Sequence, residues 1–372
     1  MTTVTMEDAA AGRDGESGHG VGDRTLPVDT DEGGRAQLEQ SEAKSALHVL
    51  IVGAGIGGLT LATSLCENGV ETEIVERAAE FTIAGAGIVL HPNGMRAMEI
   101  LGLKREIETR GCRIESIRSS GPEGIREVPL QVVFPKSTHT IALRRSALHD
   151  VLLRRALAAG AELSMGTTIQ SIQEQHDDRI SVRFSTGMEA SFDLVVGADG
   201  VGSAVRALQF PKVRSRALDL WYWRFCIPAD ATDSTEAWVT YRRGNRMFGF
   251  IPLGDNLVHC FAQLAGANSA PQEAGDESLW LRTTFSDLHP SVAQVLQRLD
   301  QSVTVHAGPA HIVEPHCWGD RSTVLVGDAA HAVAPTFTQG GSMAIEDALV
   351  LGDALRRSPT VARAIDEYRA RR

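Results

Sequence analysis

The chain has 372 residues, of which 43% are hydrophobic and 22% charged, and its net charge is −11. This length favours about two domains, and an acidic chain without a basic stripe argues against nucleic acid as a partner. No apolar run reaches the roughly 18 residues that a membrane helix needs, and the N-terminus lacks the pattern of a signal peptide. We therefore expect a cytoplasmic protein without a transmembrane segment.

The first segment of the chain is polar and acidic. Residues 1–48 carry ten acidic and four basic side chains, and residues 1–44 contain no aromatic residue. Such a composition buries too little apolar surface to offset the entropy of folding. We predict that residues 1–44 form a disordered acidic tail.

Residues 45–77 carry a strand–helix–strand pattern. Residues 47–52 are an apolar run, typical of a strand buried on both faces of a parallel sheet. Residues 59–65 predict a helix, and residues 72–75 predict a second strand that ends at Glu76. This order predicts a βαβ unit.

A glycine-rich loop joins the first of these strands to the helix. Gly53 permits the tight turn, Gly55 lets a diphosphate approach the backbone, and Gly58 allows the helix to pack closely on the strand. Glu76, 23 residues after Gly53, is placed to accept hydrogen bonds from ribose hydroxyls. The pattern predicts a dinucleotide at the helix N-terminus but does not distinguish FAD from NAD.

The middle of the chain is rich in strands. Short alternating runs between residues 113 and 145 indicate antiparallel strands, and residues 146–160 predict an amphipathic helix that stops at Gly160. Residues 207–312 again alternate, with turn signals at RRGN and LGDN. We predict an α/β fold in which a Rossmann-like domain with a parallel sheet (residues 45–112, 141–206 and 313–372) is interrupted by a β-rich, α+β domain (residues 113–140 and 207–312).

Two further predicted strands end in acidic residues. FDLVVGADGVGSAVR reaches Asp199, and VLVGDAAHAVAPTFTQGGSMAIEDA reaches Asp328 before a helix that opens at Gly340-Gly341. Three strand ends at one sheet edge can bind a ligand longer than an adenosine diphosphate. The dipole of the last helix would face a ring that becomes negative on reduction, as a flavin does. The spacing therefore favours FAD.

Taken together, these motifs resemble the single-component FAD-dependent aromatic hydroxylases, such as para-hydroxybenzoate, salicylate and urate hydroxylases. The resemblance covers residues 46–372 and rests on GAGIGG with Glu76-Arg77, VVGADGVGSAVR and VGDAAHAVAP…QGGSMAIEDA. It implies FAD as cofactor, NADH or NADPH as a transient co-substrate, and O₂. It also implies hydroxylation or epoxidation of a small aromatic or unsaturated substrate through a flavin C4a-hydroperoxide. The Rossmann-like domain would bind FAD, and the β-rich domain would bind the substrate.

The resemblance also assigns roles to individual residues. The residues expected to bind the cofactor are Gly53, Gly55, Ile56, Gly58, Glu76, Arg77, Arg145, Asp199, Asp328, Gly340 and Gly341. Pro335 would lie near the flavin edge where oxygen reacts. Tyr222 and Arg224 are the candidates for contact with substrate, although an exposed arginine on a sheet is about equally probable for Arg224. Tyr241 is a weaker candidate.

Other polar residues near these motifs have a structural interpretation. We expect His331 to be a packing or solvated histidine, whereas His91 and His259 remain ambiguous. Glu346 and Asp347 are expected to support the helix rather than take part in catalysis. The five dispersed cysteines fit a reducing compartment, and no metal site is predicted.

The sequence departs from the family pattern in two places. Thr338, preceded by Phe337, stands where relatives often have glycine, so we expect a different pocket shape. The chain ends at EYRARR, where relatives usually continue with more helix, which leaves a naturally short form and a truncated one open.

Parts of the sequence suggest three alternative functions. WYWRFCIP (221–228) resembles the W-x-W-x-I-P motif of flavin-dependent halogenases, but two extra residues interrupt it. We interpret it as a strand with Trp223 and Arg224 on opposite faces. An FAD-dependent reductase of the same superfamily and a non-catalytic flavin-binding paralogue remain open. The substrate and the oligomeric state are not predicted.

Overall fold

The computed structural model describes residues 47–81, 87–121, 124–133, 139–175, 179–230, 237–266 and 277–372. Residues 46–372 form one compact unit. The acidic tail predicted for residues 1–44 lies outside the described residues.

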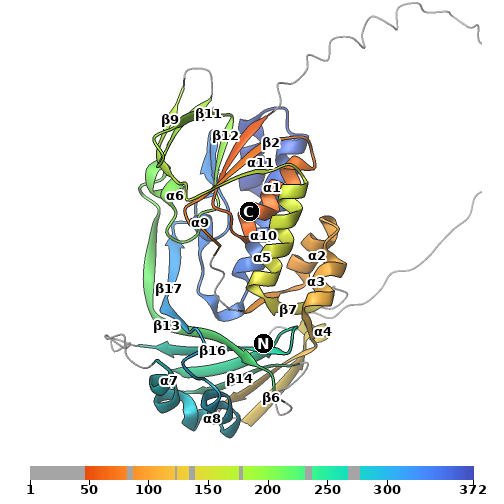
Figure 1. The fold of residues 1–372 in the computed structure, drawn as a ribbon, viewed down its shortest axis with the longest axis vertical. Coiled ribbons are helices and arrows are strands. Elements are labelled where there is room, and N and C mark those ends of the chain that lie inside the picture. Colours follow the sequence, from red (N-terminus) through yellow and green to blue (C-terminus); the bar gives the residue numbers. More distant parts are fainter. Residues whose placement is uncertain are drawn as a thin grey trace, which may run out of the picture. The chain divides into compact units, whose positions relative to one another are not determined.

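Within the described residues, a six-stranded sheet forms the first layer (Figure 1). Its strands, in spatial order, are β18 (Gly319–Asp320), β19 (Thr323–Leu325), β12 (Leu194–Gly197), β1 (His48–Val52), β2 (Glu71–Glu76) and β8 (Glu162–Met165). All neighbours pair in parallel except the edge strand β18, which runs antiparallel to β19. Parallel strands end at one common edge, and this edge positions the site.

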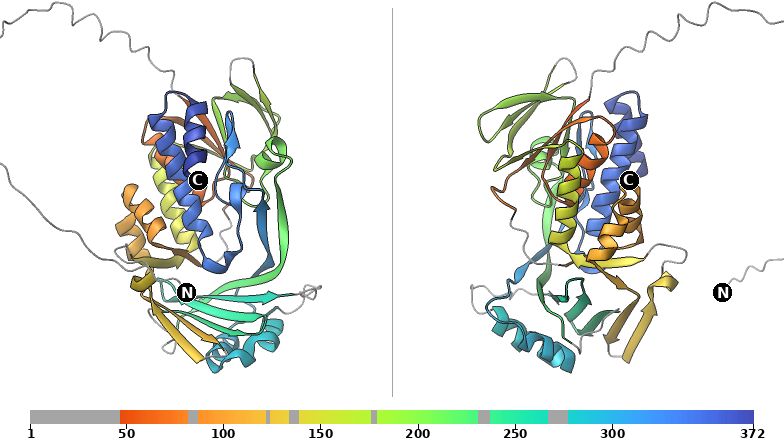
Figure 2. Two further views of the ribbon diagram at one scale, coloured as in Figure 1. Left: turned by 180° about the vertical axis from the view of Figure 1, so that it is seen from behind. Right: turned by 45° about the vertical axis from the view of Figure 1, so that its right-hand side comes forward.

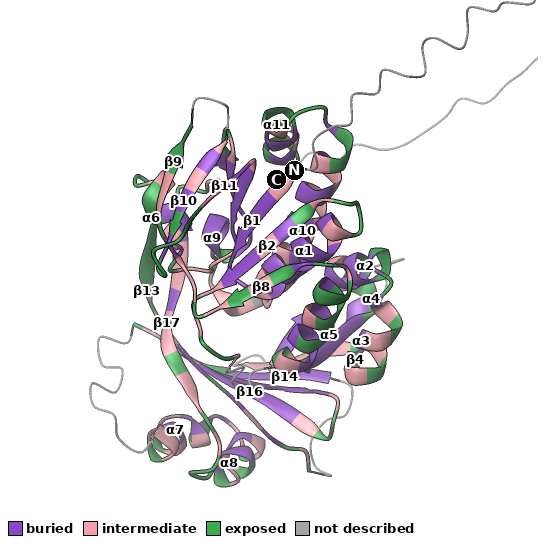
Figure 3. Cartoon of the chain, turned by 45° about the horizontal axis from the view of Figure 1, so that its top comes forward, coloured by how far each residue is buried: buried purple, intermediate pink, exposed green. Residues whose placement is uncertain are grey.

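Both faces of β1 are covered, as the apolar run predicted. Val49 and Ile51 pack against helices on one face, and Leu50 and Val52 pack against a smaller sheet on the other. The layers are seen in Figure 2, and β1 is coloured as buried in Figure 3. A strand enclosed in this way needs apolar side chains at consecutive positions, which explains the lack of alternation in its sequence.

Helices cover one face of the six-stranded sheet. They are α1 (Ile56–Cys66), α5 (Arg145–Ala158), α10 (Gly340–Arg357) and α11 (Val361–Arg371), with α2 (Pro92–Ile100) and α3 (Lys104–Arg110) beside them. The helix predicted for residues 146–160 is α5. Gly160 follows it with φ of +104°, a left-handed conformation that suits a glycine after a helix.

The opposite face is covered by a three-stranded antiparallel sheet and a short helix. These elements are β9 (Ile169–Glu174), β10 (Ile180–Phe184), β11 (Glu189–Phe192) and α6 (Ala204–Gln209). Ile169, Ile180 and Phe192 pack on Leu50 and Val195, so this small sheet completes the core around the parallel one.

A seven-stranded sheet, counted over the described residues, forms the other large layer. Its strands, in spatial order, are β17 (His306–Glu314), β13 (Arg214–Pro228), β16 (Leu257–Ala265), β15 (Arg246–Pro252), β14 (Ala237–Arg243), β5 (Ser116–Gly121) and β6 (Gly124–Pro129). The RRGN and LGDN turns connect β14 to β15 and β15 to β16, as predicted. In Figure 1, β13 and β17 run side by side toward this sheet from the level of α6 and α9 (Asp328–His331).

Two helices that pack on this sheet were not predicted from the sequence. They are α7 (Glu277–Phe285) and α8 (Pro290–Gln297), with the 3₁₀ turn η1 (Ser286–Leu288) between them. Leu281, Phe285, Val292 and Leu296 pack against Trp223 and other residues of the sheet. Their four-residue spacing within each helix, with Pro290 at the start of α8, is the signal that could have identified both helices.

The region 113–145 differs in part from its prediction. It supplies β5 and β6 to the seven-stranded sheet, and it supplies two strands to a small antiparallel sheet of β3 (Gly87–Leu90), β7 (Thr140–Arg144) and β4 (Cys112–Ile114). The short helix α4 (Leu130–Val133) follows β6. β5 pairs in parallel with β14. The two strands are joined by a long crossover rather than a hairpin, so no tight turn imposes the antiparallel direction.

The described residues contain neither a helix that could span a membrane nor a cluster that could hold a metal ion. None of the helices there has the length and apolar character to span a bilayer. No group of three or more histidine, cysteine, aspartate and glutamate side chains is arranged to hold a metal ion in that part of the chain.

Candidate active site

A cavity of about 600 Å³ lies where the parallel strands end, between that edge and the seven-stranded sheet. Every residue expected to bind the cofactor lines it except Gly58, and the three catalytic candidates line it too. The lining residues among them are Gly53, Gly55, Ile56, Glu76, Arg77, Arg145, Asp199, Tyr222, Arg224, Asp328, Pro335, Gly340 and Gly341. Segments nearly 300 residues apart in the chain are therefore assembled at one sheet edge.

The glycine loop after β1 is shaped for close contact. Gly53 has φ of +108°, and a Cβ atom on it would lie 2.5 Å from the Ala198 carbonyl oxygen. A Cβ on Gly58 would lie 2.1 Å from the Gly53 carbonyl oxygen, so Gly58 packs α1 on the strand end rather than lining the cavity. Gly55 begins α1 without a side-chain cap, and the first turn carries no acidic residue. This arrangement fits a diphosphate on the helix amides.

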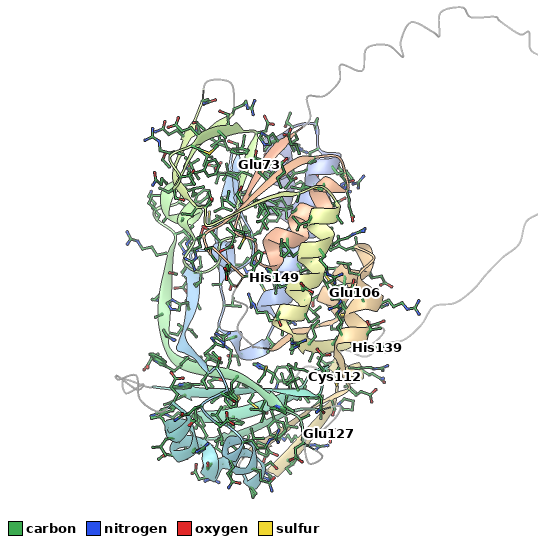
Figure 4. The ribbon with its side chains drawn as sticks, viewed as in Figure 1. Glu73, Glu106, Cys112, Glu127, His139 and His149 are labelled. Atoms are coloured by element: carbon green, nitrogen blue, oxygen red, sulfur yellow. The ribbon has the colours of Figure 1, made fainter. Side chains whose placement is uncertain are left out.

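Glu76 at the end of β2 is held by the same loop. Its two carboxylate oxygens accept hydrogen bonds from the Ala54 and Ala78 amides, each at 3.0 Å. The side chain still lines the cavity, so its remaining lone pairs can accept from sugar hydroxyls. His149 on α5, labelled in Figure 4, donates from Nε2 to the Ala54 carbonyl at 2.8 Å. Sequence analysis missed this histidine because the contact joins segments 95 residues apart.

The two carboxylate oxygens of Asp199, which follows β12, have different environments. Its Oδ2 accepts hydrogen bonds from the Ala204 amide at 2.6 Å and the Val205 amide at 3.2 Å, which organises the start of α6. Its Oδ1 is buried and finds no hydrogen-bond partner in the described part of the chain. Burial raises the pKa of this carboxyl group. A buried acceptor beside a cavity can be satisfied by a donor on a ligand.

Asp328 follows β19 in a turn that hydrogen bonds to Asp347 hold in place. The Asp347 carboxylate accepts a hydrogen bond from the Gly327 amide at 2.7 Å and one from Nε2 of His331 at 2.6 Å. Asp347 is fully buried and also lies 2.7 Å from Nε of Arg372. These contacts place Asp328, between Gly327 and His331, at the cavity wall. The supporting roles expected for His331 and Asp347 agree with this geometry.

The helix α10 begins at the same wall. Its N-cap residue, Gln339, makes no side-chain cap, and the first turn contains no acidic residue. Gly340 and Gly341 line the cavity, with the 3₁₀ turn η2 (Pro335–Phe337) just before them. The amides of an uncapped helix start favour negative charge, so this end of the cavity fits the reducible ring of a flavin.

The seven-stranded sheet supplies the other end of the cavity. Tyr222 and Arg224 of β13 face it, and the phenol oxygen of Tyr222 lies 2.9 Å from Oγ1 of Thr336. Burial raises the pKa of the Tyr222 phenol. Burial also lowers the pKa of the Arg224 guanidinium, and the charge of Arg145 acts in the same direction. The side chain nevertheless remains exposed overall, and it borders the cavity, where a ligand can reach it.

Several apolar walls of this end were not predicted. Trp238, Met247 and Phe261 line the cavity from β14, β15 and β16. His259 also lines it; its Nδ1 accepts a hydrogen bond from the Gly87 amide at 3.1 Å. Burial lowers the pKa of His259 to about 4. These faces could not be identified from the sequence, because alternation alone does not show which side of a sheet meets a ligand.

The opposite faces of the same strands form a separate core. Trp223 is buried and stacks on Trp280 with ring centroids 4.5 Å apart, so Trp223 and Arg224 do face opposite ways. Tyr241, a weaker candidate for substrate contact, stacks on His289 at 4.2 Å in this core. It does not belong to the residues that line the cavity.

Comparison with known proteins agrees with the geometry of this cavity. The model of a family described as an FAD binding domain matches residues 46–372. Aurachin C monooxygenase/isomerase of Stigmatella aurantiaca is 31% identical over 332 residues, covering 88% of this chain and 85% of that protein. The 2-heptyl-3-hydroxy-4(1H)-quinolone synthase of Pseudomonas aeruginosa is 30% identical, with 82% and 79% covered. The structure of Klebsiella pneumoniae HpxO complexed with FAD and uric acid superimposes with a TM-score of 0.77 at 25% identity, covering 88% and 84%.

Proposed function

The chain belongs to the family of FAD-dependent monooxygenases, and from this premise we propose that it oxygenates a small aromatic substrate bearing an acidic group. NADH or NADPH and O₂ are the proposed co-substrates. The observation that carries the proposal is the pairing of Arg224 with aromatic walls at the end of the cavity opposite the glycine loop. A location in the cytoplasm, where thiols stay reduced, is part of the same proposal.

The residues at the sheet edge would hold FAD in an extended form. The α1 amides would bind the diphosphate, Glu76 the adenosine ribose, and Asp328 the ribityl chain. Arg77 lines the cavity next to Glu76, at the proposed adenine end. When bound, FAD supplies hydride acceptance from a nicotinamide and the activation of O₂ for transfer of one oxygen atom.

The start of α10 would stabilise the reduced state of the cofactor. Its uncapped amides face the cavity at Gly340 and Gly341, where they favour negative charge on the ring. Pro335 and Thr336 would form the wall beside the reactive edge. A wall without charged groups excludes water from the reacting atoms.

The substrate would bind against the seven-stranded sheet. Trp238 and Phe261 offer faces and edges for an aromatic ring, and Met247 adds a flexible apolar side chain to the same wall. Arg224 is the cation at this end that is best placed to bind a carboxylate or an ionised ring hydroxyl by charge-assisted hydrogen bonds. Tyr222, whose pKa is raised by burial, stays neutral and holds its proton at the phenol oxygen.

The test is NADH and NADPH consumption by the FAD-loaded protein in air, with hydrogen peroxide quantified in parallel. A panel of phenols, quinolones, indoles and purines would be compared, each with and without an acidic group. We expect an acidic aromatic compound to accelerate the oxidation of NADH or NADPH. The amount of hydrogen peroxide formed should then be smaller than the amount of nicotinamide consumed. If neither NADH nor NADPH reduced the flavin in the presence of any of these compounds, the proposal would be refuted.

A further inference from the structure

Thr338 has an unusual backbone conformation at the cavity wall. Its φ of 53° and ψ of 22° lie in the left-handed region, at the end of the η2 turn and two residues before α10. A β-branched side chain is disfavoured there because its Cβ substituents crowd the backbone. Such an outlier persists only where surrounding contacts hold it in place.

The other left-handed residues with side chains have ordinary explanations. Among the described residues they are Asp255, Asn256 and Arg321, all in tight turns between antiparallel strands. Aspartate and asparagine tolerate this conformation, and such turns often require it. Thr338 differs because it is β-branched, lies outside a hairpin and lines the cavity.

His91 supplies a contact that can hold Thr338 in place. Nε2 of His91 lies 2.9 Å from Oγ1 of Thr338. His91 is itself fixed, since only 4% of it is exposed and its amide donates to Oγ of the buried Ser342 at 3.3 Å. The pair therefore links the start of α2 to the turn that precedes α10.

The same turn also forms a hydrogen bond on its other side. The phenol oxygen of Tyr222 lies 2.9 Å from Oγ1 of Thr336, which connects the turn to the seven-stranded sheet. Two side-chain hydrogen bonds thus hold residues 335–338 between two layers of the molecule. Their position determines where the cavity wall stands relative to the amides of Gly340 and Gly341.

We propose that Thr338 is a positioning residue, whose hydroxyl binds His91 and keeps the 335–338 turn in a conformation that its own side chain disfavours. The turn then holds the wall beside the cofactor ring. This inference rests on the FAD site of the family and not on the proposed substrate. It goes beyond the binding roles given above, because it concerns how the wall is held and not what touches the ligand.

The test compares three substitutions at Thr338. Thr338→Val keeps the shape and loses the hydroxyl, Thr338→Ser keeps the hydroxyl, and Thr338→Gly removes both the hydroxyl and the strain. Amide hydrogen exchange in peptides covering residues 333–343 of the apoprotein reports the turn directly, and FAD fluorescence titration reports the site. Neither measurement needs NAD(P)H or substrate, so a failure of the proposed function leaves the test intact.

We expect Thr338→Val to increase exchange in this peptide and to weaken FAD binding by about five- to tenfold, the cost of one hydrogen bond. Thr338→Ser should stay close to the parent protein. Thr338→Gly should bind FAD more tightly than Thr338→Val, because glycine adopts the left-handed conformation without help. Wild-type exchange and affinity in Thr338→Val, or weaker binding in Thr338→Gly than in Thr338→Val, would overturn the proposal.

Two further variants guard against indirect effects. His91→Phe should reproduce the effect of Thr338→Val, and the double variant should add little to either, since both remove the same contact. Additive effects would contradict the assigned pairing. Arg321→Gly is the matched control: it removes a left-handed side chain, with φ of 52°, from a turn outside the cavity. It should leave FAD affinity unchanged.

Discussion

Asp347 and His331 form a buried pair behind the cavity, with Oδ2 of the carboxylate 2.6 Å from Nε2 of the ring and neither side chain more than 3% exposed. The same oxygen accepts a hydrogen bond from the Gly327 amide at 2.7 Å. The helix α10 is therefore bonded to the turn that presents Asp328. A residue outside the cavity lining thus positions one that lies within it.

Asp347→Ala should destabilise the protein strongly. It leaves His331, the Gly327 amide and Arg372 without their common buried partner, and the loss of one member of a buried pair costs about 3–5 kcal/mol. FAD should also bind more weakly, because the Gly327–Asp328 turn loses its support. Urea unfolding with and without FAD would measure both effects.

Asp353→Ala on the same helix is the control for this change. Asp353 is partly exposed and pairs with Arg356, Arg357 and Arg371. Partly exposed pairs of this kind contribute about 1 kcal/mol or less each. Equal losses of unfolding free energy in the two variants would contradict a special role for Asp347.

Asp328→Ala should reduce FAD affinity without unfolding the apoprotein. If the carboxylate accepts hydrogen bonds from the ribityl chain, their loss costs about 2 kcal/mol, or roughly thirtyfold in Kd. Flavin fluorescence titration and the rate of reduction by NADH or NADPH would measure the result. Full flavin occupancy with normal reduction would refute the role of Asp328. Asp320→Ala, an exposed position on β18, serves as control.

The sequence predicted which strand ends converge on the cavity, because the signals there are local. Glycines and acidic residues directly follow strands, and parallel strands end at one edge, so Gly53, Glu76, Asp199 and Asp328 converge without knowledge of distant contacts. Asp199 shows the limit of such reasoning. Its motif was recognised, but its hydrogen bonds to the Ala204 and Val205 amides became visible only in the structure.

The end of the cavity at the seven-stranded sheet was less accessible to prediction. Trp238, Met247 and Phe261 lie on three different strands, and the face that each presents depends on pairing with distant partners. Thr338 was recognised as a departure from the family pattern. Its left-handed backbone and its contact with His91, 247 residues away, depend on tertiary packing that no local pattern encodes.

Arg224→Met should weaken the use of acidic substrates selectively. Loss of a charge-assisted hydrogen bond costs about 2–3 kcal/mol, which corresponds to roughly a 30- to 150-fold increase in KM if the contact is equal in the ground and transition states. Matched aromatic compounds without the acidic group should be little affected. Arg224→Lys should restore only part of the affinity, because lysine lacks the planar fork of donors.

Steady-state kinetics on a pair of compounds that differ only in the acidic group would test this expectation. Arg243→Met is a suitable control, since Arg243 is exposed and pairs with Asp287 outside the cavity. If Arg224→Met raised KM equally for the acidic and the neutral compound, the arginine would not select for charge.

His259 should make the protein sensitive to acid. Its folded-state pKa of about 4, lowered first by burial and then by the charge of Arg224, lies below the ordinary value of 6.5. The unfolded chain therefore binds a proton more readily than the folded one as pH falls below 6.5. The stabilisation is fully present above pH 6.5 and is lost progressively down to about pH 4, where the loss reaches roughly 3 kcal/mol.

His259→Gln tests this expectation, because glutamine keeps an acceptor for the Gly87 amide and does not titrate. The free energy of unfolding in urea would be measured at pH 7 and at pH 4.5 for the parent protein and the variant. The parent should lose more stability between these pH values than His259→Gln. His316→Gln, at an exposed histidine, should behave as the parent does. If His259→Gln lost as much stability as the parent, protonation of other groups would account for the acid sensitivity.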